Sequence, residues 1–286
     1  MKIGINSWSF PTNLTLEETF KLAKEFGYDT IELNMAENVQ HENIVSDLGL
    51  QDTPHLTTEM TQPDFDNILA LSKQYDLPIS SIATALHWQY PLNHADQTIR
   101  EKGKDIVKQM IVACQALGGD TVLIVPGVVT PDHPYDACYD LSLAAFKELA
   151  PFAEEHGIKI GIENVWNKFL LSPLEMKQFV EAINHPYVGV YFDAGNVLQF
   201  GYPDQWVRIL DQHIVKVHVK DFDTNIGNIT GFKNLLAGSL DWQRLVQSLR
   251  DIRYDGPLTA ELSPYKVGGT QLAKDTAEAL RIITNL

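Results

Sequence analysis

The feature that most constrains the fold is the alternation of short apolar runs with longer amphipathic stretches along the whole chain. Strands are predicted at residues 2–8, 30–33, 79–85, 121–125, 158–163, 188–193, 214–219 and 258–262. Most of these runs are continuously apolar, as expected for parallel strands that are covered on both faces. Repeated strand-then-helix units that close on themselves predict an α/β fold, the (β/α)8 TIM barrel.

The amphipathic stretches carry helix start and stop signals. The first predicted helix, 16–26, follows Thr15 and ends at Gly27, a favourable pair of cap residues. Further helices are predicted at 64–75, 96–117, 136–155, 172–183, 241–249 and 270–286. Segment 35–66 shows no clear pattern, and we expect an insertion there. A doubly wound open sheet is the rival fold, but the first strand is not followed by the usual glycine-rich turn.

Length and composition indicate one cytoplasmic domain that spans residues 1–286. The chain has no linker-like or low-complexity tract, and 286 residues suit one α/β barrel. A net charge of −15 without a basic stripe argues against nucleic acid as a partner. The N-terminal residues lack the apolar core of a signal peptide, and no apolar stretch approaches about 20 residues, so no membrane segment is expected. The two cysteines, Cys114 and Cys138, are interpreted as free thiols in a reducing compartment.

Side chains able to bind a metal end four consecutive predicted strands: Glu163, Asp193, His218 and Glu261. The carboxyl ends of barrel strands converge on one mouth, so these side chains should meet. Three partly buried carboxylates repel one another, and a divalent cation relieves that repulsion. Any one of these residues alone would be read as an ordinary strand-end salt bridge. Four in succession predict a site for one divalent ion: Mn²⁺, Mg²⁺ or Co²⁺, with Zn²⁺ as a further candidate.

The residues around these four carry a family resemblance. Segments 161–164, 192–196, 217–221 and 259–261, and above all 163–173, resemble the xylose isomerase-like TIM-barrel superfamily of sugar phosphate isomerases and epimerases. Within it, the chain is most similar to ketose 3-epimerases such as L-xylulose-5-phosphate 3-epimerase, and to hexulose-6-phosphate isomerase-like proteins. The resemblance implies a sugar or sugar phosphate substrate, one metal ion with Mn²⁺ favoured, and a homodimer or homotetramer.

The resemblance also implies a mechanism. Glu163 and Glu261 would be the catalytic acid–base pair, acting on opposite faces of a bound ketose through a metal-stabilised enediolate. Two positions depart from the tagatose epimerases, which have His where this chain has Asn196 and Glu where it has Phe169. These departures favour a phosphorylated or otherwise different substrate.

Several further residues are predicted near the mouth of the barrel. Asn6 and Trp8 are read as the end of the first strand and Glu32 as the end of the second, while His87 and Trp88 follow the third. Trp8, Trp88 and Trp166 are candidates for walls that stack on a sugar or simply plug the barrel. The predicted substrate-binding residues are Asn6, Trp8, His87, Trp166, Asn196 and Lys220.

Three alternatives stay open: an aldose–ketose isomerase, a metal-dependent dehydratase of a polyol or keto substrate (inosose dehydratase-like), and a barrel that binds sugar without catalysis. An AP endonuclease of the same superfamily is disfavoured, because extra histidine ligands and a basic DNA groove are not evident. No Gly-x-Gly-x-x-Gly, P-loop or Gly-x-Ser-x-Gly motif occurs, so no nucleotide cofactor and no serine hydrolase chemistry are predicted.

Overall fold

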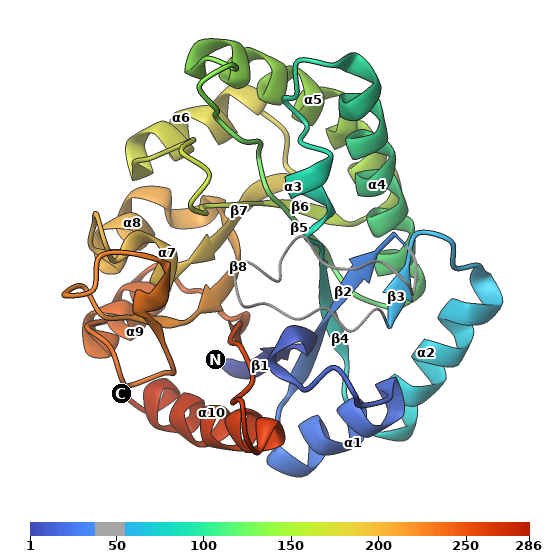
Figure 1. The fold of residues 1–286 in the computed structure, drawn as a ribbon, viewed down its shortest axis with the longest axis vertical. Helices are drawn as coiled ribbons and strands as arrows, with labels where there is room; N and C mark the ends of the chain where they lie inside the picture. Colours follow the sequence, from blue (N-terminus) through green and yellow to red (C-terminus); the bar gives the residue numbers. More distant parts are fainter. Residues whose placement is uncertain (38–54) are drawn as a thin grey trace.

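The computed structural model describes residues 1–37 and 55–286. The chain forms a barrel of parallel strands surrounded by a ring of helices (Figure 1). The barrel strands are β1 (Lys2–Asn6), β2 (Thr30–Ala36), β4 (Ile79–Ala83), β5 (Thr121–Ile124), β6 (Lys159–Glu163), β7 (Val188–Asp193), β8 (Ile214–Val219) and β11 (Pro257–Ala260).

Strand pairing closes the barrel. Each barrel strand pairs in parallel with its neighbours in chain order, and β1 pairs with both β2 and β11. The short strand β3 (Leu56–Thr57) pairs in parallel with the carboxyl end of β2. The prediction of a (β/α)8 TIM barrel is therefore confirmed, and the open-sheet alternative is wrong.

Helices cover the outside of the barrel. The longer ones are α1 (Leu16–Phe26), α2 (Gln62–Gln74), α4 (Gln97–Ala116), α5 (Tyr135–His156), α6 (Pro173–Ile183), α8 (Pro203–Leu210), α9 (Trp242–Asp251) and α10 (Gly269–Thr284). The first begins at a capping box between Thr15 and Glu18 and ends at Gly27 in the left-handed region, as its sequence predicted. No helix within the described ranges is long and apolar enough to cross a membrane.

The main core lies between the barrel and the helices, and the inside of the barrel is largely polar. Side chains alternate along a strand, so Ile160 and Ile162 of β6 join the core under the helices while Glu163 faces inward. A small separate apolar cluster contains Ala83, Leu123 and Tyr191. Buried polar side chains from β1, β2, β4, β7 and β8 hydrogen-bond to one another beside it.

Several expected boundaries differ from the structure. The first strand ends at Asn6, because the Asn6 side chain accepts from the Trp8 backbone N–H and opens the 3-10 turn Ser7–Ser9. The second strand continues to Ala36, so Glu32 lies inside the barrel and not at the strand end. Of the predicted insertion at 35–66, residues 38–54 lie outside the described part of the chain. The short helices α3 (Leu86–Gln89) and α7 (Ala194–Val197), and α8, were not predicted.

We expect Phe179→Ala to lower the free energy of unfolding by about 3–5 kcal/mol. Phe179 of α6 is fully buried, and its ring contacts Tyr139, Phe146 and Phe169, which join two helices to the loop after β6. Chemical denaturation measures the change. Leu174→Ala on the same helix is the matched control, since Leu174 is 62% exposed and should change stability by less than about 0.5 kcal/mol. Equal effects of the two variants would contradict this packing.

Candidate metal centre

Four neighbouring strands bring the predicted metal-binding side chains together. Glu163 ends β6, Asp193 ends β7, His218 lies in β8, and Glu261 directly follows β11. The strand register places Asp193 opposite His218, and Thr259 of β11 on the other side of His218. All four side chains are buried, and each offers one ligand atom within 4.8 Å of the others. This buried cluster could hold a metal ion.

Two asparagines fix the position of Asp193. Asn164 donates from Nδ2 to the Asp193 carbonyl (2.8 Å) and accepts from its backbone N–H (2.9 Å). Asp193 in turn caps α7, accepting from the Asn196 N–H at 2.8 Å. Asn196 also donates from Nδ2 to Glu163 Oε1 at 3.3 Å. Asn164 was not predicted as a functional residue, although it directly follows Glu163 in the segment that carries the resemblance.

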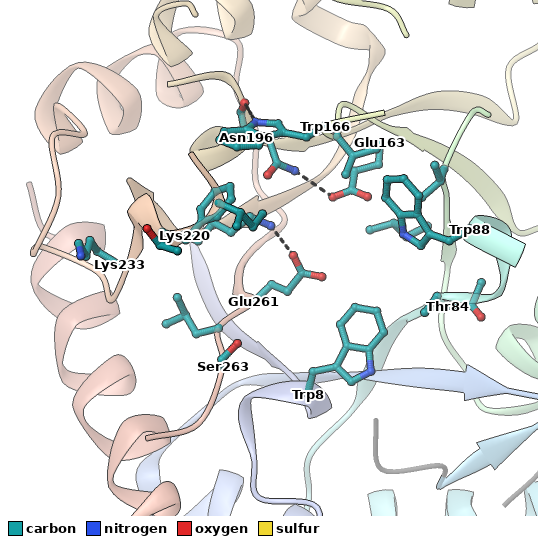
Figure 2. A pocket seen from close by; sticks show the side chains of 18 of the residues that line it. Trp8, Thr84, Trp88, Glu163, Trp166, Asn196, Lys220, Lys233, Glu261 and Ser263 are labelled. Carbon is teal, nitrogen blue, oxygen red and sulfur yellow. Dashed lines mark hydrogen bonds and ion pairs between the residues drawn. The ribbon is translucent and has the colours of Figure 1, made fainter. Parts of the chain in front are cut away.

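Lys220 places its ammonium group among the carboxylates. Its Nζ lies 2.8 Å from Asp193 Oδ2. It also lies 2.5 Å from Glu261 Oε2, the contact marked in Figure 2. The Lys220 chain passes so close to Gly195 that a Cβ there would lie 2.5 Å from Lys220 Cγ. Glycine is therefore required at position 195 for Lys220 to reach the cluster.

Burial and crowding perturb the carboxyl groups unequally. Burial, with the neighbouring charge of Glu261, raises the pKa of Glu163 to about 8. Burial also raises the pKa of Asp193, although Lys220 acts against it. For Glu261 burial acts in the same direction, but the adjacent Lys220 ammonium holds its pKa below the ordinary value. Glu163 and Asp193 therefore ionise less readily than ordinary carboxyl groups, and the Lys220 ammonium supplies positive charge to the cluster.

His218 contacts an acidic side chain on one edge and the carboxylate cluster on the other. Its Nε2 lies 2.6 Å from Glu32 Oε1, and its Nδ1 lies 3.8 Å from Glu261 Oε2. Burial would lower the pKa of His218, but Glu32 and then Glu261 raise it to about 9. Within residues 1–37 and 55–286, the buried Nδ1 has no hydrogen-bond partner. An unpartnered imidazole nitrogen beside three carboxylates is a donor set that fits a divalent ion such as Mn²⁺.

A cavity of about 300 Å³ opens directly above the cluster. Glu163 and Glu261 line it, whereas Asp193 and His218 are not among its lining residues. Figure 2 shows the side chains of Glu163 and Glu261 pointing toward one another, with Trp8, Trp88 and Trp166 around them. A molecule in this cavity would therefore meet two carboxylates and a largely apolar wall that includes three tryptophans.

The structure brings four of the six predicted substrate-binding residues into the cavity wall: Trp8, Trp166, Asn196 and Lys220. Asn6 and His87 are not part of that wall. Asn6 is turned into the barrel interior, where its Nδ2 lies 2.6 Å from Glu32 Oε1. His87 of α3 is fully buried, burial lowers its pKa to about 4, and neither ring nitrogen has a partner among the described residues.

One side of the cavity comes from a segment whose contribution was not predicted. Strands β9 (Asp221–Phe222) and β10 (Phe232–Lys233) form a hairpin immediately after Lys220, and its Thr230, Lys233 and Asn234 line the cavity. These strands have two residues each, too short for a periodicity signal. Phe169 lies outside the wall and packs its ring against Tyr135 and Phe179.

The fold and the site define a TIM barrel with a candidate metal centre at the carboxyl end of its strands. Residues 20–286 match the family model described as xylose isomerase-like TIM barrel. The chain therefore belongs to this family, which confirms the resemblance inferred from the sequence.

Individual relatives are distant. The chain is 22% identical to L-ribulose-5-phosphate 3-epimerase UlaE of Salmonella typhimurium, over 91% of this chain and 86% of that one. It is 24% identical to an uncharacterized protein of Methanocaldococcus jannaschii, and this match spans 58% of each chain. The crystal structure of D-psicose 3-epimerase with D-tagatose from Clostridium cellulolyticum H10 superposes with a TM-score of 0.78 at 15% identity, covering 100% of this chain and 99% of that one. That likeness shows the shared fold.

We expect Mn²⁺ affinity to rise with pH between pH 6 and pH 8. The raised pKa values of His218 (about 9) and Glu163 (about 8) mean that both hold protons in this range, and these protons must leave when an ion binds. The dissociation constant should fall by up to about tenfold per pH unit for each displaced proton. Isothermal titration calorimetry of EDTA-treated protein measures it.

The partly exposed His213 provides the control for this titration. His213→Ala should leave both the affinity and its pH dependence unchanged. A dissociation constant that stays constant from pH 6 to pH 8 in the unmodified protein would show that the cluster binds no ion in competition with protons.

Proposed function

We propose that this chain is a metal-dependent isomerase of sugars or sugar phosphates, most specifically a ketose 3-epimerase. The observation that carries the proposal is the position of Glu163 and Glu261. Both belong to the four-residue cluster, and both also line the cavity where a substrate would lie. Asp193 and His218 would hold the ion from below without reaching the substrate. The family membership and the 3-epimerase named among the relatives support the same reaction.

The chemistry follows from this arrangement. A divalent ion in the cluster, with Mn²⁺ favoured, would supply positive charge that stabilises an enediolate. One of the two glutamates removes the proton from C3 of the ketose, and the electron pair of that bond moves toward the C2 carbonyl oxygen. The other glutamate returns a proton to C3 from the opposite face. The mass of the sugar is unchanged, and only the configuration at C3 is inverted.

The remaining cavity residues would orient the substrate. Lys220 and Asn196 contact the two glutamates and keep them in place, through the ion pair with Glu261 and the hydrogen bond to Glu163. The rings of Trp8 and Trp166 offer apolar surface for the C–H face of a sugar. These roles for Trp8, Trp166, Asn196 and Lys220 are part of the proposal.

Solvent exchange tests the reaction. The protein, treated with EDTA and reloaded with Mn²⁺, is incubated in D₂O with a panel of ketoses and ketose phosphates, and NMR locates the incorporated deuterium. We expect metal-dependent deuterium at C3. Glu163→Gln and Glu261→Gln should each slow exchange by about 10²- to 10⁴-fold at saturating Mn²⁺. Glu25→Gln is the control, because Glu25 lies on the surface with 54% of its side chain exposed.

Other outcomes of this experiment select the alternatives. Deuterium at C1 or C2 would identify an aldose–ketose isomerase. A product lighter by one water molecule would identify a dehydratase. Mn²⁺ binding with no exchange and no loss of water across the panel would contradict the proposed epimerase and favour a barrel that only binds sugar.

A further inference from the structure

We propose that Glu32 is a positioning residue of the metal centre, which holds the His218 ring and directs its Nδ1 toward the bound ion. This inference rests on the proposed metal centre and concerns a residue outside the ligand cluster. Glu32 lies within β2, on the opposite side of His218 from the carboxylates. It has no exposed surface and is not among the residues that line the cavity, so it would act only through the groups it touches.

The Glu32 carboxylate accepts from four side chains inside the barrel. Oε1 accepts hydrogen bonds from His218 Nε2 (2.6 Å) and Asn6 Nδ2 (2.6 Å). Oε2 accepts hydrogen bonds from Ser81 Oγ (2.7 Å) and Tyr191 Oη (2.5 Å). These partners come from four different strands, and they determine the position of the carboxylate. One of its oxygens thereby presents a fixed acceptor to His218.

This acceptor determines how His218 can bind an ion. An ionised carboxylate only accepts, so His218 Nε2 must carry a hydrogen, and the electron pair available for a metal is then on Nδ1. Nδ1 is the nitrogen that faces Glu261 and lacks a hydrogen-bond partner among the described residues. The ring of Tyr191, centred 4.5 Å from the imidazole, restrains the plane of His218. Carboxylates in this position orient metal-binding histidines and make them stronger donors.

A role in packing alone explains Glu32 poorly. TIM-barrel interiors are usually filled by branched aliphatic side chains, and a buried carboxylate costs desolvation energy that such residues avoid. Here β1, β4, β7 and β8 each contribute a donor to this one group, while the apolar cluster beside it has only three residues. A buried carboxylate with four donors is explained if the negative charge of Glu32 serves to hold and orient the His218 ring.

Co²⁺ binding tests the inference, with affinity measured by calorimetry and ligand geometry by the visible absorption spectrum. Glu32→Gln keeps the shape, and the Asn6 amide still directs the remaining carbonyl oxygen toward His218, so this variant removes mainly the charge. We expect its Co²⁺ dissociation constant to rise about 10-fold, and that of Glu32→Ala about 100-fold. The absorption bands of bound Co²⁺ should shift in both variants.

Ser72→Ala is the matched control, because it removes a buried hydrogen bond, from Ser72 Oγ to the Leu77 carbonyl, that involves neither Glu32 nor His218. It should leave the Co²⁺ affinity and spectrum unchanged. The inference is overturned if Glu32→Gln folds and still binds Co²⁺ with the same affinity and spectrum as the unmodified protein, whatever its melting temperature. If the unmodified protein binds no Co²⁺, the proposed metal centre itself fails, which is a different result.

Discussion

Buried negative charge at the carboxyl end of the barrel is the constraint on which the rest of the structure depends. Glu163, Asp193 and Glu261 bring three largely buried carboxylates within a few ångströms of one another. Coulomb repulsion in such a place is large unless positive charge is supplied. Lys220 supplies one unit, and a divalent ion would supply the other two. The neighbouring carboxylates raise the pKa of both Glu163 and His218, which reflects the same need for positive charge.

A second layer of polar contacts inside the barrel supports this cluster from below. Asn164 fixes Asp193 from the end of β6, and Glu32 fixes His218 from β2. The barrel interior therefore acts as a hydrogen-bonded base for the site, while the main apolar core lies outside the strands, under the helices. Apolar packing holds the strands and helices in place, and the polar network inside the barrel orients the side chains that would bind the metal. The cavity above exposes only the two glutamates of the cluster to a substrate.

The sequence was sufficient to predict the barrel and the meeting of the four strand-end residues, because apolar runs mark parallel strands and their carboxyl ends converge. It was insufficient for residues whose role depends on tertiary contacts. Glu32 and Asn6 were expected near the mouth, but β2 is three residues longer than its apolar run and the Asn6 side chain turns inward. The wall from Thr230, Lys233 and Asn234 depends on a hairpin too short to leave a pattern. His87 follows β4 but does not line the cavity, because its side chain is fully buried within the fold.

The central claim is that these four side chains together bind one divalent ion. Anomalous X-ray diffraction from crystals grown with Mn²⁺ tests it most directly. The account predicts one anomalous peak per chain, within bonding distance of a carboxylate oxygen of Glu163, Asp193 and Glu261 and of Nδ1 of His218. A structure at saturating Mn²⁺ with no peak at this position, and with Lys220 still paired to Asp193 and Glu261, would contradict it.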